Sequence, residues 1–225
     1  MRSNLFASTL AIALGVASPI VGTIGFPEIA VAQTVDSRKV EADRLLQQGK
    51  KQFDAKQFDA AIQSYQQALQ IYREIKDQSS EGESLDKLGD VYSSSGKYSK
   101  SIELYEQSLS IALKLNLPKE ESRILENIGS VYSSLGSYPR AIEYYEKGLL
   151  ISRNTKDIFR EGSVLNSLAN VYQSLSDYPK AAEYLQQSLD IARKLESPGG
   201  MISVLESIGS VYTYIGDYPK AIEFS

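Results

Sequence analysis

The chain has 225 residues, 42% of them hydrophobic, which is long enough to bury a sizeable core. Its 28 acidic residues and 24 Lys plus Arg give a net charge of −4, and the basic residues are scattered rather than concentrated into the surface that a nucleic-acid partner requires. Because the chain has no Cys and no His, disulfides, Cys-ligated zinc, thiol nucleophiles and His-based acid–base catalysis are excluded. We expect no nucleic-acid partner and no cofactor.

Residues 1–32 are typical of a secretory signal peptide. Arg2 supplies a positive charge, an apolar stretch follows over residues 5–17, and Ala30 and Ala32 form a small-residue cleavage motif. This pattern predicts cleavage between Ala32 and Gln33. The mature chain is then expected to be exported to a periplasmic or extracellular compartment and to be free of the membrane.

Two other interpretations of this segment are a buried N-terminal helix and an uncleaved membrane anchor. Pro19, Gly22, Gly25 and Pro27 interrupt any helix soon after the apolar stretch. The remaining stretch is shorter than the ~20 residues that span a bilayer. A signal peptide is therefore favoured over both.

The rest of the chain, residues 33–225, is a repeat array. A small residue stands every forty positions, at Gly49, Gly89, Gly129, Ala169 and Gly209, and similar sequence surrounds each. A fixed period of this length is the signature of a stacked repeat architecture. We divide the array into four full copies and the start of a fifth, with approximate bounds 41–78, 79–118, 119–158, 159–198 and 199–225.

The sequence pattern of each copy predicts a helical hairpin. In the third copy Leu125, Ile128, Gly129 and Tyr132 follow the i, i+3, i+4, i+7 spacing of one helix face, and the same spacing recurs in the other copies. A turn follows, in which Gly96, Gly136 and Gly216 can adopt a positive φ, and in which Ser137, Asp177 and Asp217 suit N-capping of a second helix. Small residues such as Gly129 and Gly148 should allow the two helices to approach closely. Stacked hairpins of this kind form an all-α solenoid.

The third copy resembles the tetratricopeptide repeat, in the order Leu125, Gly129, Tyr132, Gly136, Tyr138, Ala141, Tyr145, Gly148. The forty-residue period departs from the usual 34 and is similar to that of kinesin light chain-type repeats. The resemblance implies a right-handed superhelical solenoid of antiparallel hairpins. It also implies a non-catalytic module that binds a protein or peptide in the groove lined by the first helix of each copy.

The predicted groove is the helix flank opposite the apolar stripe. It is expected to be mostly uncharged and rich in side chains that both donate and accept hydrogen bonds. Its predicted residues are Arg123, Glu126, Asn127, Ser130, Asn166, Asn170, Gln173, Ser210 and Tyr214.

Catalytic and sugar-binding roles are disfavoured by the same periodicity. Tyr92, Tyr132, Tyr172 and Tyr212 recur at one helical position, which indicates packing rather than a carbohydrate platform. Glu103, Glu143, Glu183 and Glu223 recur on the expected outer face of each second helix, so they do not converge as a catalytic pair would. We predict that the chain is not an enzyme.

The fifth copy stops early in its second helix, at Ser225. A solenoid end without a polar cap exposes apolar surface. One expectation is self-association through this end, in a structural scaffold. Another is that the chain is the N-terminal part of a larger protein, and the resemblance to exported bacterial repeat proteins implies a caspase-like peptidase domain as one such continuation.

Overall fold

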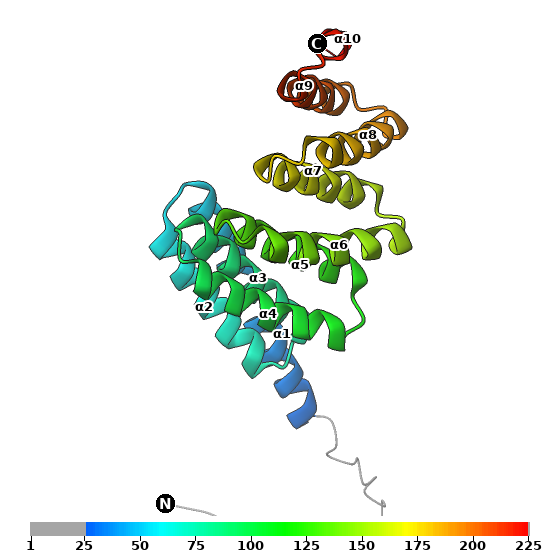
Figure 1. The fold of residues 1–225 in the computed structure, drawn as a ribbon. Helices are drawn as coiled ribbons and strands as arrows, with labels where there is room; N and C mark the ends of the chain where they lie inside the picture. The colour runs from blue at the N-terminus through cyan, green and yellow to red at the C-terminus, as the bar shows by residue number, and fades with distance from the viewer. Residues whose placement is uncertain (1–25, 225) are drawn as a thin grey trace, which may run out of the picture.

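The computed structural model describes residues 26–224, and these residues form helices without any strand (Figure 1). Most helices have 17 or 18 residues, α1 is longer, and α10 is short. The helices are α1 (Phe26–Asp54), α2 (Phe58–Glu74), α3 (Gln78–Ser94), α4 (Tyr98–Lys114), α5 (Pro118–Ser134), α6 (Tyr138–Thr155), α7 (Ile158–Ser174), α8 (Tyr178–Lys194), α9 (Pro198–Ile215) and α10 (Tyr218–Glu223). None of them is both long and apolar enough to cross a membrane.

Short turns join the helices, and their chemistry follows the sequence pattern. Gly96, Gly136 and Gly216 adopt φ values of 74°, 69° and 85°, as predicted. Asp177 and Asp217 cap α8 and α10 by accepting a hydrogen bond from a backbone N–H of the first turn. The prediction for the equivalent Ser137 is wrong in its mechanism, because its side chain makes no capping hydrogen bond to α6.

The hairpins close tightly because a glycine on the first helix faces a tyrosine ring on the second. A Cβ added to Gly129 would lie 2.8 Å from Tyr145 Cδ1, and one added to Gly89 would lie 2.5 Å from Tyr105 Cε1. Real Cβ atoms do not approach ring carbons so closely, so only glycine fits here. In the fourth copy both residues change together: Ala169 stands in place of the glycine, and Leu185 in place of the tyrosine.

The hairpins stack in chain order into an all-α solenoid, with the N-terminal copies at one end and the C-terminal copies at the other (Figure 1). Each helix packs on the next along the chain, and the odd-numbered helices of consecutive copies also contact one another, as α1 does α3, α3 does α5, and α5 does α7. The odd-numbered helices therefore form the inner layer. This arrangement confirms the predicted fold class.

The recurring tyrosines lie among other tyrosine rings and basic side chains rather than in a fully apolar core. Tyr132 and Tyr172 stack on Tyr144 and Tyr184 of the following helix, with ring centroids 5.4 Å apart in each pair. A basic group also lies over each ring, Arg140 over Tyr132 and Lys180 over Tyr172, at 5.3 and 4.9 Å from the ring centroid. These rings pack at the hairpin edge, and the glutamates Glu103, Glu143, Glu183 and Glu223 are exposed.

Candidate protein-binding surface

The inner layer brings equivalent residues of successive copies into rows. One row contains Lys50, Asp90, Ser130, Asn170 and Ser210, each directly after the small residue of its copy. Ser130, Asn170 and Ser210 are exposed. The row therefore runs from charged residues in the first two copies to neutral, hydrogen-bonding residues in the last three.

Three predicted groove residues on α7 keep their side-chain amides open. Asn166 and Gln173 are half-buried and Asn170 is exposed. Within residues 26–224, none of these three amides hydrogen-bonds to another group of the chain. They offer donors and acceptors along one helix face, as the backbone of an extended peptide would require.

The predicted groove residues on α5 are instead engaged between copies. Arg123 Nη1 donates to Asp86 Oδ2 of α3, and Asn127 Nδ2 donates to Asp86 Oδ1 at 3.2 Å. Glu126 accepts from Arg160 Nη1 of α7 at 2.6 Å. These side chains join neighbouring hairpins, so only part of each is available to a partner.

Tyr214 lies at the C-terminal end of the predicted groove. It is 66% exposed, and its ring stacks on Tyr178 with centroids 5.2 Å apart and planes at 2°. This stacking orients the ring while most of the residue stays exposed. A fixed, exposed aromatic ring is the type of side chain that anchors protein partners.

A polar cluster lies where α3 meets α5. We call it the α3–α5 polar cluster; its members are Asp86, Lys87, Asp90, Tyr105, Arg123 and Asn127. Asp86 has no exposed side-chain surface and is paired with both Arg123 and Lys87, the latter at 3.2 Å. Lys87 Nζ also donates to Asp90 Oδ2 at 3.0 Å, and the Tyr105 hydroxyl donates to Asp90 Oδ1 at 2.7 Å.

Burial and neighbouring charges shift the pKa values of Asp90 and Lys87 within the α3–α5 polar cluster. Burial, followed by the nearby Asp86 carboxylate, raises the pKa of Asp90 above the ordinary aspartate value. Burial works against the charge of Lys87, but the Asp86 and Asp90 carboxylates outweigh it and raise the pKa of Lys87. The cluster therefore holds a charged lysine beside an aspartate whose ionisation is costly.

We expect Asp90→Asn to be at least as stable as the parent protein at neutral pH. A carboxyl whose pKa is raised by folding contributes stability at pH below its unfolded pKa, and that contribution is lost as pH rises through the folded pKa. The amide oxygen of the variant would still accept the Tyr105 hydrogen bond without the ionisation cost. Urea unfolding of both proteins across a pH series measures this. A parent that gains stability over the variant as pH rises from acidic to neutral would contradict it.

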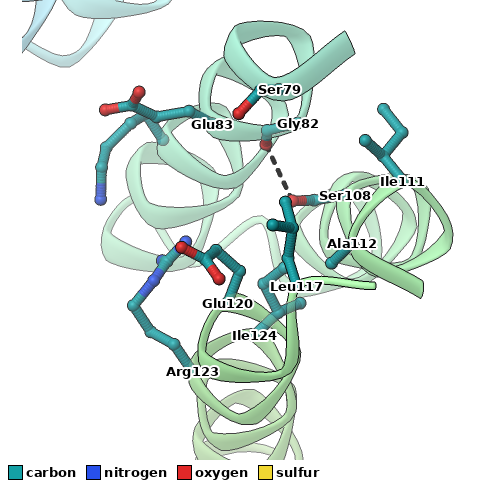
Figure 2. A pocket seen from close by; sticks show the side chains of 11 residues that line it. Ser79, Gly82, Glu83, Ser108, Ile111, Ala112, Leu117, Glu120, Arg123 and Ile124 are labelled. Carbon is teal, nitrogen blue, oxygen red and sulfur yellow. Dashed lines mark hydrogen bonds between the residues drawn. The ribbon is translucent and has the colours of Figure 1, made fainter. Parts of the chain in front are cut away.

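Two hollows open beside the α3–α5 polar cluster. The first, which we call the α3–α5 hollow, has a volume of about 290 Å³ and lies between α3, α4 and α5. Figure 2 shows its apolar wall of Ile111, Leu117 and Ile124 opposite Glu83 and Arg123, with Ser108 donating to the Gly82 carbonyl. The second, the α1–α3 hollow, has a volume of about 240 Å³.

Sequence reasoning missed both the polar cluster and the hollows. Asp86 and Arg123 belong to different copies and are 37 positions apart, so no pattern within one copy connects them. The sequence signal that could have indicated the polar cluster is a charged residue at one repeat position: Asp90 stands where later copies have the neutral residues Ser130, Asn170 and Ser210.

The inner surface carries hydrogen-bonding and ionic groups. Within the described part of the chain, no group of three or more carboxylate side chains is arranged to hold a metal ion. The fold and this surface define the class as a helical-repeat interaction scaffold.

The chain belongs to the tetratricopeptide repeat family, whose model matches residues 51–114, 120–194 and 160–225. The match is to a repeat family that is generally a non-enzymatic interaction scaffold, and it indicates no catalytic family. No curated protein sequence matches the chain.

Solved structures share the fold at low sequence identity. BtubC (BKLC) from P. vanneervenii is 21% identical, with a TM-score of 0.64, over 84% of this chain and 87% of its own. Kinesin light chain-like repeats from Podosopora anserina are 22% identical, with a TM-score of 0.63, over 85% and 91%. The apo form of RapI is 21% identical, with a TM-score of 0.73, over 82% of this chain but only 51% of its own.

Proposed function

We propose that the protein is a non-catalytic interaction module that binds a protein or peptide along the inner face of α5, α7 and α9. The observation that carries this proposal is the set of open amides on α7: the side-chain amides of Asn166, Asn170 and Gln173 have no hydrogen-bond partner within the described residues. The open solenoid supports it, since the inner layer exposes one continuous surface. RapI and the kinesin light chain-like repeats share only the fold with this chain and do not identify the partner.

We expect Asn166→Ala with Asn170→Ala to weaken capture of the partner by about thirtyfold, because two hydrogen bonds of about 1 kcal/mol each are lost. The measurement is affinity capture with the full chain as bait, followed by titration of the captured protein. Asn127 is left intact because it supports Asp86 and Asp90.

The matched control is Asn154→Ala with Gln186→Ala, which removes two exposed amides from the outer helices α6 and α8. It should bind as the parent protein does. Equal losses in both variants, or undiminished binding by the α7 variant, would place the binding surface elsewhere.

We further propose that the chain is exported and processed after Ala32. Residues 1–25 lie outside the described residues, and the proposed cleavage point lies within α1. Arg38 and Lys39, which pair with Glu74 and Asp77, follow that point, so processing would leave these contacts intact. Intact-mass analysis of the exported protein should give a chain that begins at Gln33. A cytoplasmic protein with the full N-terminus would contradict export.

A further inference from the structure

The Tyr65 hydroxyl lacks the hydrogen-bond partner that the hydroxyl of the equivalent Tyr105 has. Tyr65 is 1% exposed, and its hydroxyl is buried with no hydrogen-bond partner within the described residues. A buried hydroxyl without a partner is costly, and few such groups occur in native proteins. Burial raises the pKa of Tyr65 to about 12, so the hydroxyl is neutral and can both donate and accept.

The reason lies in the residue that follows the packing glycine. In the second copy, the hydroxyl of Tyr105 donates to Asp90, directly after Gly89, at 2.7 Å. In the third, the Ser167 and Ser130 side chains oppose the rise that burial causes in the pKa of Tyr145, and Ser130 stands directly after Gly129. In the first copy the corresponding residue is Lys50, whose ammonium group cannot accept a hydrogen bond.

Tyr65 lines the α1–α3 hollow, which carries more acidic than basic groups. Its charged lining residues are Lys50, Asp54, Glu83, Lys87 and Asp90. Lys87 and Asp90 are already paired with each other. Asp54 and Glu83 are exposed and form no ion pair within the described residues, which leaves two free carboxylates beside a buried hydroxyl.

The wall of the hollow also has an apolar part. Leu46, Phe53 and the Tyr65 ring line it alongside the charged groups. A long side chain with an aliphatic stem and a cationic tip matches this combination, because its stem packs on apolar surface while its tip is paired. Lys50 is exposed, so its charged tip can stay in water outside the hollow.

We propose that the α1–α3 hollow is a specificity pocket for a basic side chain, arginine or lysine, of a bound peptide. The cationic tip pairs with Asp54 and Glu83 and donates a hydrogen bond to the Tyr65 hydroxyl. Glu83 also lines the α3–α5 hollow (Figure 2), so the two hollows share this carboxylate. The proposal rests on the proposed function and adds the chemistry of the partner.

The test uses the full chain and three short Gly/Ser peptides that carry arginine, norleucine or glutamate at the same positions, with binding followed by fluorescence anisotropy. The arginine peptide should bind most tightly, and added salt should weaken it. Glu83→Gln should reduce its affinity about tenfold, because one charge-assisted hydrogen bond is lost. Glu183→Gln, the same charge change on the exposed side of α8, should leave affinity unchanged.

Tyr65→Phe separates a ligand role from a structural one. It keeps the ring against Gly49 and removes only the unpartnered hydroxyl, so folding stability should not fall, whereas peptide affinity should drop severalfold. Equal binding of the three peptides, a preference for the glutamate peptide, or no binding of the arginine peptide would overturn the proposed basic site. Equal losses of affinity in Glu83→Gln and Glu183→Gln would also overturn it. Capture of a partner that depends on Asn166 and Asn170 would still uphold the proposed function in each of these cases.

Discussion

Gly129→Ala is expected to lower the free energy of unfolding by about 2 kcal/mol, although alanine is the better helix former. The new methyl group would lie 2.8 Å from two ring carbons of Tyr145, and the ring cannot rotate out of a filled hairpin. The hairpin must therefore open or the ring must leave its rotamer. Chemical unfolding followed by circular dichroism measures the change.

Adding Tyr145→Leu should recover part of this loss. The double variant recreates the pair that the fourth copy already has, Ala169 beside Leu185. Tyr145→Leu alone should also be destabilising, since it leaves a cavity beneath Gly129. In a double-mutant cycle, the two substitutions should be coupled by about 1–2 kcal/mol in the stabilising direction. Simple additivity would show that the fit between ring and glycine does not determine hairpin stability.

Asp86→Asn is expected to cost about 3 kcal/mol of unfolding free energy, because removing one member of a buried ion pair leaves its partners uncompensated. Asp86 has no exposed side-chain surface and compensates both Arg123 and Lys87. Glu143→Gln serves as the control. It breaks the exposed pair with Lys147 and should leave the free energy of unfolding nearly unchanged.

The double variant Asp86→Asn with Arg123→Ser should be more stable than Asp86→Asn alone. Asn166 and Ser203 are the equivalent residues two copies later, so the fold accommodates a neutral pair at these positions. Thermal unfolding of the three proteins provides the comparison. A double variant less stable than the single one would mean that Arg123 stabilises the junction through its packing rather than through its charge.

The hairpins could be predicted because their determinants lie within one copy. Gly129, Tyr132 and Gly136 have a spacing that only a pair of close helices explains, and the structure confirms the fold. Contacts between copies could not be predicted in this way. Asn127 has the side chain expected of a binding surface, yet its amide reaches Asp86 on the preceding inner helix. Whether a polar residue of the inner layer faces a partner or the next hairpin depends on the stacking geometry, which the period alone does not define.

The chemically different junctions between copies have a consequence for folding errors. Nearly identical hairpins can dock out of order, so that one copy is skipped or exchanged between two chains. Here Lys39 of α1 meets Asp77 before α3, Asp86 of α3 meets Arg123 of α5, and Glu126 of α5 meets Arg160 of α7. Skipping α5 would leave the buried Asp86 opposite the neutral Ser163, the residue equivalent to Arg123 in the next copy. The polar pairs therefore make misordered docking less stable and favour the correct order of the repeats along the array.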